Sequence, residues 1–234
     1  MIDIVLKEGF DRLGLDLPEA ALENYKSFYK YLVEKNKVMN LTAITGEEET
    51  AKLHLLDCAA LLGAADFAGK RVIDVGTGAG FPGMPLRISM PDMEITLLDS
   101  LGKRVDFLKE CCELLGFENV RCIHARAEEA PPEFRESFDI AISRAVAKLR
   151  MLCEICLPFV QVGGLFIAMK GPSPHEELKE AENAIITLGG EPQGIFEYLI
   201  PETDISHTAV LIKKVKSTPE KYPRRFARIQ KTPL

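Results

Sequence analysis

The 234-residue sequence contains no tryptophan and no long uninterrupted apolar segment. Its longest stretch without a charged residue, from 155 to 169, is broken by Pro158 and by a glycine pair. A transmembrane helix needs about 20 predominantly apolar residues, so this stretch is too short to cross a membrane. The N-terminus carries acidic residues from Asp3 onward and lacks the apolar core of a secretion signal. We therefore expect a cytoplasmic protein without a membrane partner.

The six cysteines lack the pattern of a zinc site. Cys153 and Cys156 have C-x-x-C spacing, but neither a second such pair nor paired histidines complete a set of four ligands. The two lie in an apolar run that reads as helical, where residues at i and i+3 share one face. Without an export signal, the thiols are expected to stay reduced. The sequence thus predicts buried core thiols, no disulfide and no metal.

The chain lacks an excess of positive charge except at its C-terminal end. The whole chain has a formal net charge of −6, which disfavours a protein that binds nucleic acid over its entire surface. Residues 211–234, in contrast, contain eight Lys and Arg against one Glu. A basic segment on an acidic body is typical of a contact with a polyanion, and it equally fits a solubilising tail. Charge alone leaves both interpretations open.

Composition and periodicity predict one compact unit with three parts. Apolar residues make up 47% of the chain, which suffices for a sizeable core. Residues 1–66 are predicted to form a helical cap, in which Thr45 and Glu48 have the spacing of a capping box that opens a second helix. Residues 67–216 form the main domain, and residues 217–234 form the basic tail.

Short apolar runs alternate with amphipathic segments in the main domain, which predicts an α/β fold. The last two runs are separated only by the turn PETDIS, so they should form an antiparallel hairpin at the edge of the sheet. We expect helices between the first five strands, notably over 101–115 and 174–188. The fold class is therefore a doubly wound, mostly parallel sheet of seven strands. The strands are predicted at 71–76, 94–100, 120–127, 138–146, 164–171, 195–200 and 207–215.

A glycine-rich turn follows the first predicted strand and is the sharpest functional signal. Asp74, Gly76 and Gly78 lie in the sequence DVGTGAGFPG, and glycines at a strand-to-helix turn let a ligand approach the backbone closely. The stretch from Gly78 also fits the G-x-G-x-x-G of dinucleotide folds, but this match starts late and Pro82 has no amide hydrogen. An acid at the turn instead suits a ligand with an ammonium and a sulfonium group, as in S-adenosylmethionine. A glycine turn without any ligand is the third interpretation.

Charged residues end the other predicted strands. Asp99 ends the second strand, where a carboxylate can accept hydrogen bonds from both ribose hydroxyls or cap the next helix. Arg144 and Lys170 end the fourth and fifth strands, and open α/β sheets bind ligands at that edge. Two cations there suit a phosphate-bearing or electron-rich substrate. In the cap, His54 and Asp57 are spaced to pair on one helical face, which is most often a structural arrangement.

Several motifs together resemble the ribosomal small-subunit methyltransferase G family, also called glucose-inhibited division protein B. The resemblance rests on NLTAIT, DVGTGAGFPGMPL, LLDSLGKRVDFL, ISRAVAKL and MKG, and it runs from about residue 32 to the C-terminus. It implies a class I Rossmann-like methyltransferase that modifies N7 of one guanine in the 530 loop of 16S rRNA. The implied cofactor is S-adenosyl-L-methionine, and the implied partner is 16S rRNA or the 30S ribosomal subunit. The protein is expected to bind this partner as a monomer.

The resemblance also implies which residues form the site. The cofactor would be held by Asp74, Gly76, Gly78, Phe81, Asp99, Ala127, Glu128 and Arg144. The RNA would be met by Asn40, His54, Arg104, Arg224 and Arg225, with Arg144 and Lys170 as the catalytic residues. The chain departs from the family at Lys35, where a Trp is common, at Cys58 in place of Ser, and after Arg225, where FARIQ replaces a glycine.

The implied chemistry is consistent with these residues. Guanine N7 carries an in-plane lone pair and no proton, so methyl transfer to it needs no general base and no covalent nucleophile; the enzyme has to align the reacting atoms. No Pro-Cys or [DN]-P-P-[YF] motif, which would mark a cytosine or an exocyclic amine as the target, follows the fourth predicted strand. Two other functions stay open: a methyltransferase for a small molecule or a protein, and a non-catalytic module that binds S-adenosylmethionine or RNA.

Overall fold

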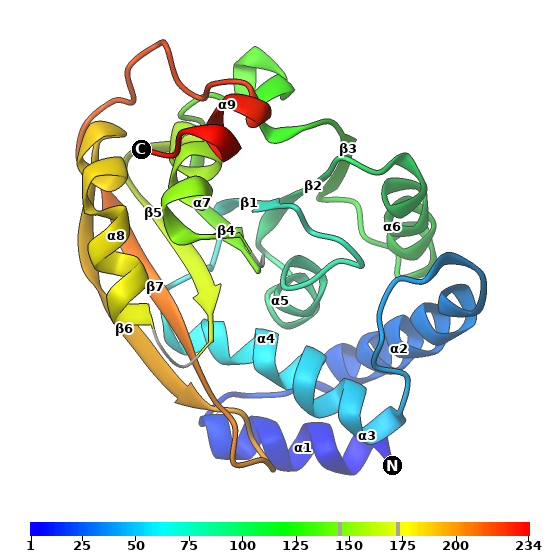
Figure 1. The fold of residues 1–234 in the computed structure, drawn as a ribbon. Helices are drawn as coiled ribbons and strands as arrows, with labels where there is room; N and C mark the ends of the chain where they lie inside the picture. Colours follow the sequence, from blue (N-terminus) through cyan, green and yellow to red (C-terminus); the bar gives the residue numbers. More distant parts are fainter. Residues whose placement is uncertain (145–146, 172–173) are drawn as a thin grey trace.

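The fold is built on one seven-stranded sheet, seen in a computed structural model that describes residues 1–144, 147–171 and 174–234 (Figure 1). The strand order is β3-β2-β1-β4-β5-β7-β6. Neighbouring strands pair in parallel except β7, which runs antiparallel to both β5 and β6. The predicted mostly parallel sheet with its terminal hairpin is therefore confirmed. The strands are β1 (Arg71–Val75), β2 (Glu94–Asp99), β3 (Val120–His124), β4 (Phe138–Ser143), β5 (Val160–Lys170), β6 (Gly190–Leu199) and β7 (Ser206–Lys214).

Helices cover both faces of the sheet and create two apolar cores. Val72 packs with the N-terminal helices, α5 and α6 on one face, whereas Ile73 packs with α7 and α8 on the other. The two residues separate in this way because successive side chains of a strand point to opposite faces. The helices are α1 (Ile2–Leu13), α2 (Glu19–Met39), α3 (Glu47–Thr50), α4 (Asp57–Ala59), α5 (Gly83–Ser89), α6 (Gly102–Leu114), α7 (Leu149–Cys156), α8 (Pro174–Thr187) and α9 (Phe226–Lys231).

The N-terminal region is helical and lies along the lower side of the view in Figure 1. The predicted capping box is wrong, because α3 begins at Glu47 after Gly46 and has no side-chain cap. Glu47 instead accepts a hydrogen bond from the Ile2 amide at 2.9 Å, which ties α3 to α1. The chain then continues through a π-helical segment, Ala51–Leu56, into α4. π-helical turns occur frequently at functional sites, and this one carries His54.

The connection from β3 to β4 differs from the prediction. Instead of an α-helix it contains two short 3-10 turns, Ala127–Glu129 and Pro132–Phe134. Pro131 and Pro132 lack the amide hydrogens that a helix would need at these positions. This irregular connection leaves the residues after β3 close to the carboxyl ends of the strands.

Strand boundaries also differ: β6 begins at Gly190 instead of 195, and β3 ends at His124 instead of 127. β5 begins at Val160 instead of 164, and its pairing with β4 shifts register between Phe138 and Ile140. The prediction that the fourth strand reaches residue 146 concerns 145–146, which lie outside the described residues; β4 ends at Ser143.

The C-terminal segment packs against the main domain. Lys214 is fully buried, and its Nζ lies 3.2 Å from Glu136 and donates a hydrogen bond to Thr218. Tyr222 and Ile229, further along, are buried as well. The segment from 217 onward is thus part of the folded body, and not all of its basic residues face solvent.

An ion pair with α7 fixes this segment. The Arg224 guanidinium donates to Glu154 through Nε (2.6 Å) and Nη2, and the Arg224 backbone amide donates to the same carboxylate at 3.0 Å. Glu154 is completely buried on α7. Bidentate arginine–carboxylate pairs of this kind have a fixed geometry, so α9 is held beside α7, as Figure 1 shows.

Other expectations concern membranes, metals and thiols. None of the helices in the described ranges is long and apolar enough to cross a membrane. Among the same residues, no group of three His, Cys, Asp or Glu side chains could hold a metal ion. Cys153 and Cys156 are free thiols on the buried face of α7.

Candidate functional site

The turn after β1 is held in shape by the carboxylate of Asp74. Its Oδ2 accepts hydrogen bonds from Thr77 Oγ1 (2.7 Å) and from the Gly83 amide (2.8 Å). Gly76 (φ +74°) and Gly78 (φ +62°) adopt the left-handed conformation that favours glycine. A Cβ at either glycine would meet nothing within 4 Å. Both predicted glycines therefore border open space that a ligand can occupy.

The dinucleotide interpretation of the same turn does not fit the structure. A Cβ at Gly80 would lie 2.6 Å from Met84 Cγ, and one at Gly83 would lie 2.5 Å from Leu97 Cδ2. The Gly83 amide is already donated to Asp74. These two glycines are needed for packing against the core, so they do not cradle a pyrophosphate.

Asp74 is fully buried, and burial raises its pKa to about 6 although the bonds from Thr77 and Gly83 oppose the shift. Its second oxygen, Oδ1, has no hydrogen-bond partner among the described residues. Buried polar atoms are nearly always partnered. An unsatisfied carboxylate oxygen at this turn is therefore what a site for a polar, cationic ligand provides, and direct contact between Asp74 and a cofactor stays a prediction.

Asp99 ends β2, and two backbone amides hold its carboxylate. Oδ2 accepts from the Gly78 amide (2.8 Å) and Oδ1 from the Leu101 amide (2.9 Å), while Arg104 Nη1 lies 3.7 Å from Oδ2. The alternative prediction of Asp99 as N-cap is wrong, because Leu101 is the N-cap of α6. A carboxylate has about four acceptor positions. The two amides leave lone pairs that can accept from the hydroxyls of a ribose.

A cavity of about 250 Å³ brings four of the predicted cofactor residues together: Gly76, Asp99, Ala127 and Glu128. An apolar cleft with a few convergent polar groups is the usual form of a cofactor site. With the open glycine turn and the oriented carboxylate, these residues fit S-adenosylmethionine. The other lining residues are mostly apolar: Val75, Leu98, Ser100, Ala125, Arg126, Ser143, Ala147, Leu152, Ile155 and Phe226.

Phe81 connects the glycine turn to Arg144. The Arg144 guanidinium lies over the Phe81 ring, 4.8 Å from its centroid, which is within the range of a cation–π contact. The His54 ring stacks on Phe81 as well, at 4.5 Å between centroids. Three predicted site residues from the cap, the turn and β4 therefore form one stacked group.

Asp57 holds Arg144 from the other side. The buried Asp57 carboxylate accepts from Arg144 Nη1 (3.3 Å), from Tyr198 Oη (2.8 Å) and contacts His207 Nδ1 (2.8 Å). The predicted pairing of His54 with Asp57 is replaced, in the described part of the chain, by a shared contact with Arg144. Asp57 and His54 of the cap thus fix the guanidinium, while the hairpin residues Tyr198 and His207 hold the Asp57 carboxylate.

The two histidines of this cluster have opposite environments. Burial, reinforced by the Arg144 charge, lowers the pKa of His54 to about 4, whereas the hydrogen bond to Asp57 raises the pKa of His207 above its ordinary value of 6.5. His54 Nδ1 lies 3.4 Å from Arg144 Nη1 and 3.1 Å from the Leu53 carbonyl oxygen, and Nε2 lies 2.8 Å from Thr42 Oγ1. The cluster therefore keeps one neutral and one readily protonated imidazole.

A titration followed by NMR tests these assignments. We expect a midpoint near pH 4 for His54 and one above 6.5 for His207. Because the unfolded chain binds the His54 proton first, this residue should reduce stability as the pH falls from 6.5 towards 4, while the His207 contribution should be lost as the pH rises through its raised pKa. Equal midpoints for His54 and His207 would contradict the geometry.

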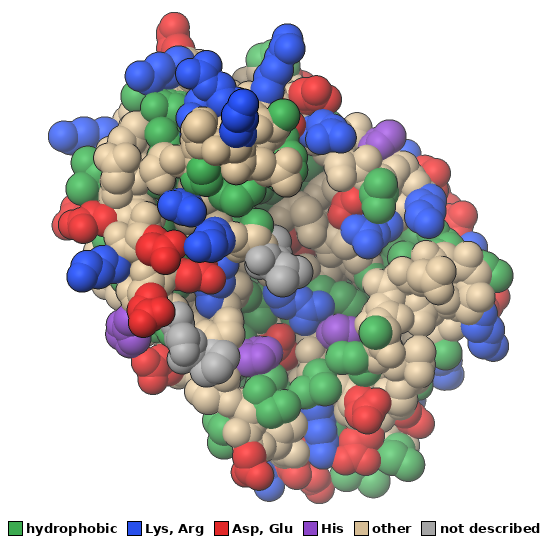
Figure 2. All heavy atoms as spheres, in the orientation of Figure 1, with side chains coloured by type: hydrophobic (Ala, Val, Ile, Leu, Met, Phe, Trp, Pro, Cys, Tyr) green, Lys and Arg blue, Asp and Glu red, His purple; other side chains and the backbone are tan. Residues whose placement is uncertain are grey.

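A second cavity, of about 420 Å³, adjoins this cluster and is lined by Leu53, Asp57, Arg144, Met169, Lys170, Gly171, Glu177 and His207. Lys170, predicted to be catalytic, lines it but is also bound: Nζ lies 2.7 Å from Glu177 and donates to the Ala147 carbonyl at 2.6 Å. Lys170 therefore also holds the chain that follows β4. Histidine and basic side chains lie around the hollow at the centre of the face shown in Figure 2.

Other predicted RNA-binding residues lie away from this cluster. Asn40 is exposed and ends α2 in a left-handed conformation. Arg104 is near Asp99 at the cofactor side, as its 3.7 Å distance shows. Arg224 is bound to Glu154, and the neighbouring Arg225 is exposed. The RNA-binding roles of these residues stay predictions.

Sequence reasoning missed three residues that shape the site: Asn36, Tyr198 and His207. Asn36 shapes the loop after α2, because its Oδ1 accepts from the Leu41 and Thr42 amides. Tyr198 and His207 are both on the terminal hairpin and meet Asp57 across more than a hundred residues. No local pattern marks these contacts. The one available signal is a titratable residue at the start of a strand, such as His207 in β7.

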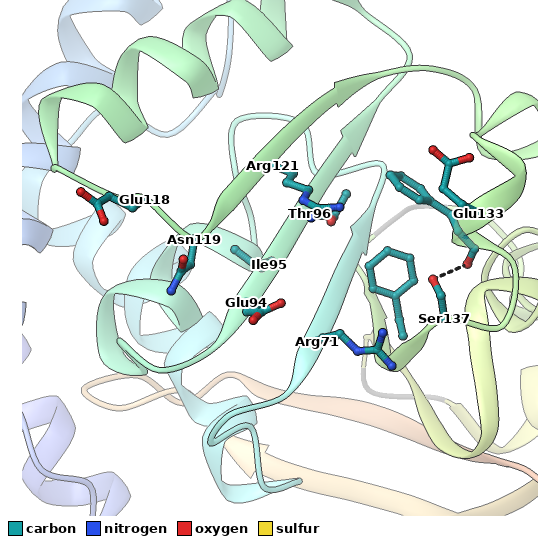
Figure 3. Close-up of a pocket in the computed structure, with 11 residues that line it drawn as sticks. Arg71, Glu94, Ile95, Thr96, Glu118, Asn119, Arg121, Glu133 and Ser137 are labelled. Atoms are coloured by element: carbon teal, nitrogen blue, oxygen red, sulfur yellow. Dashed lines mark hydrogen bonds between the residues drawn. The ribbon is translucent and has the colours of Figure 1, made fainter.

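A further cavity, of about 490 Å³, lies at the opposite edge of the sheet, where the strands begin (Figure 3). Arg71, Glu94 and Arg121 from the first residues of β1, β2 and β3 line it, together with Glu133. Its charges are mixed, and Figure 3 shows Glu118 and Glu133 far apart on its two sides. Parallel α/β sheets bind ligands at the carboxyl edge, so this cavity is not the candidate site.

Comparison with known proteins identifies relatives that span the whole chain. Residues 21–205 match the family described as rRNA small subunit methyltransferase G. The chain is 48% identical over 233 residues to the ribosomal RNA small subunit methyltransferase G of Clostridium perfringens (strain 13 / Type A), with 98% of each chain covered. It is 45% identical to the protein of the same name from Alkaliphilus metalliredigens, over 99% of this chain and 98% of the relative.

Solved structures are similar in fold. The M. jannaschii protein TYW2 in complex with AdoMet superposes with a TM-score of 0.52 at 17% identity, over 68% of this chain and 75% of that one. A SAM-dependent methyltransferase from Aquifex aeolicus gives 0.53 at 19% identity, over 71% and 93%. At these identities the similarity concerns the fold alone, and it places the chain among Rossmann-like folds of this type.

Proposed function

The chain belongs to the ribosomal RNA small subunit methyltransferase G family, and on this premise we propose that it transfers a methyl group from S-adenosyl-L-methionine to N7 of a guanine in the 530 loop of 16S rRNA. The substrate in the cell is 16S rRNA or the 30S subunit that contains it. The enzyme acts on it in the cytoplasm as a monomer.

One observation carries the proposal from the structure. Ser143, the last residue of β4, lines the cofactor cavity, and Arg144, the next residue, lines the second cavity. Both cavities therefore border the carboxyl end of β4. Such an arrangement suits a reaction in which a group passes directly from a bound cofactor to a second bound molecule.

The chemistry makes limited demands on the protein. The cofactor supplies an electrophilic methyl group on a sulfonium: the bond from N7 to carbon forms as the bond from carbon to sulfur breaks, and its electron pair stays on sulfur. Since N7 carries no proton, Arg144 and Lys170 are needed for orientation and not as bases. The Arg144 guanidinium, a planar fork of donors, is placed to hold the guanine O6 or a phosphate.

Charge in the second cavity fits the product. Methylation at N7 leaves a purine with a positive charge. Two carboxylates, Asp57 and Glu177, line this cavity beside the cations. Their negative charge offsets that of Arg144 and Lys170, so the cavity as a whole does not repel a cationic purine.

The decisive experiment is transfer of labelled methyl from S-adenosylmethionine to unmethylated 30S subunits, with 7-methylguanosine mapped by borohydride–aniline cleavage. We expect a single cleavage in the 530 loop. Naked 16S rRNA, assayed alongside, decides between free and assembled substrate. Label that appears only in an RNA-free extract would point to a small-molecule or protein substrate, and cofactor binding without any transfer would point to a non-catalytic module.

Basic side chains of the C-terminal segment support RNA binding outside the pocket. Lys and Arg side chains gather over this segment in Figure 2, and Arg225, Arg228 and Lys231 are exposed there. Removal of the whole segment is a poor test, because Tyr222 and Ile229 are buried in the core. Single surface substitutions avoid that problem.

We expect the triple change Arg225→Ala, Arg228→Ala and Lys231→Ala to reduce the salt dependence of 30S binding. Each lost phosphate contact lowers the slope of log K against log salt by about 0.7 to 0.9, so the total loss should be about 2 to 3. Filter binding at several salt concentrations measures it. Exposed lysines far from this segment, Lys7 and Lys30, provide the control. A slope equal to that of the unchanged chain would show that these cations serve only solubility.

A further inference from the structure

The cofactor cavity has a wall that comes from the C-terminal segment. Phe226, the first residue of α9, lines the cavity together with Leu152 and Ile155 of α7. The side chains of α7 on this face are three residues apart, so they present one apolar surface. Phe226 is half-buried, and it supplies the one aromatic ring among the described lining residues.

Two contacts fix Phe226 at this position. The Phe226 amide donates a hydrogen bond to Glu128 Oε1 at 3.2 Å. Two residues earlier, Arg224 is bound to the buried Glu154 of α7. The ring is therefore held between the residues that follow β3 and the helix that follows β4. These contacts attach this part of the chain to the folded body.

The strand order determines which part of the cofactor lies near this ring. Along the carboxyl edge, β4 with Arg144 and the second cavity lies on one side of β1, and β2 and then β3 lie on the other. The reacting methyl group has to face the second cavity. Asp99 at the end of β2 is placed to bind the ribose, so the base has to lie beyond it, near Ala127 and Glu128 after β3.

We propose that Phe226 packs against the adenine ring of S-adenosylmethionine and is a cofactor-binding residue. This inference rests on the proposed function, from which it takes the cofactor. Adenine has two flat apolar faces and a polar edge, and aromatic side chains stack well on such faces. Leu152 and Ile155 form an apolar surface next to the ring, while Glu128 is at the edge. The stretch FARIQ, where the resemblance leads one to expect a glycine, thus completes the pocket.

Calorimetric binding of S-adenosylhomocysteine and of 5′-methylthioadenosine to the full chain, without RNA, tests this proposal. Stacking of a base on an aromatic side chain contributes enough binding free energy that Phe226→Ala should weaken the binding of both ligands by about 10-fold or more. The two losses should be equal, because the ligands share the adenosine part. Phe226→Tyr, which keeps the ring, should restore binding, and Gln230→Ala, at an exposed position of the same helix, should leave it unchanged.

The absence of tryptophan from the chain allows a direct readout. Phe226→Trp introduces a single tryptophan, whose emission should change when 5′-methylthioadenosine binds. Ala227→Trp, at the exposed neighbouring position, should show no change. This measurement does not depend on how well the alanine variant folds.

Each outcome separates the two proposals. If the unchanged chain binds neither ligand, the proposed function fails. If it binds both and Phe226→Ala binds them equally well, or loses only S-adenosylhomocysteine, the contact with adenine is refuted while the proposed function stands. The contact would also be refuted if the emission of the tryptophan at position 226 did not change on saturation with ligand.

Discussion

Arg144→Ala is expected to lower the rate of methyl transfer by about 100-fold or more, since a misplacement of about 1 Å between reacting groups has an effect of this size. The guanidinium lies between the Phe81 ring of the cofactor turn and the Asp57 carboxylate of the second cavity. Alanine removes the donors on which the orientation of the incoming nucleotide depends. Single-turnover transfer to 30S subunits, with both reactants saturating, measures the effect on the chemical step.

The loss should not come from unfolding. Asp57 has two further partners, Tyr198 and His207, both at 2.8 Å, which do not involve Arg144. The variant should therefore remain folded, which the midpoint of its urea unfolding would show. Arg144→Lys is the matched variant, because it keeps the charge and loses the planar fork. We expect it to recover only part of the rate. Full activity of the lysine variant would mean that charge alone suffices, and full activity of the alanine variant would remove Arg144 from the mechanism.

Glu154→Ala is expected to reduce the free energy of unfolding by about 3 kcal/mol, which is the lower end of the range for breaking a buried ion pair. Glu154 is fully buried on α7, and its carboxylate receives the Arg224 guanidinium and the Arg224 amide. Without it, both donors lose their partner and the segment from 217 onward loses its attachment. Urea unfolding gives the stability, and trypsin cleavage at the exposed Arg225 reports release of the segment.

A double-mutant cycle separates the pair from general damage. Arg224→Ala removes the other partner, and the double variant should be more stable than the sum of the two single losses predicts. Glu220→Ala, an exposed acid in the same segment, should change neither stability nor cleavage. If Glu154→Ala leaves the trypsin pattern as it is, the ion pair does not hold the segment in place.

The sheet and its carboxyl edge could be predicted because their signals are local. A strand such as 71–75 is marked by its own apolar run, and the glycines after it by the turn that they form. Asp74, Asp99 and Arg144 then come together through topology alone, since parallel strands end at the same edge. The β3–β4 connection was mispredicted because two adjacent prolines outweighed the expected alternation of helix and strand.

The contacts that position Arg144 could not be predicted in this way. Asp57 meets Tyr198 and His207 across 141 and 150 residues, and no spacing rule spans such a separation. The same holds for the adjacent Arg224 and Arg225, which read alike in the sequence. One is bound and the other exposed because Glu154, 70 residues earlier, lies beneath the first.

The packing of α9 on α7 has a consequence for the order in which the protein matures. Translation produces the glycine turn and Asp99 well before Phe226, which lines the same cavity. The nascent chain can therefore form the first strands of its sheet while one side of the cavity is still missing. The pocket is complete only after Phe226 has left the ribosome and α9 has packed on α7, so the finished cofactor site forms later than the turn that begins it.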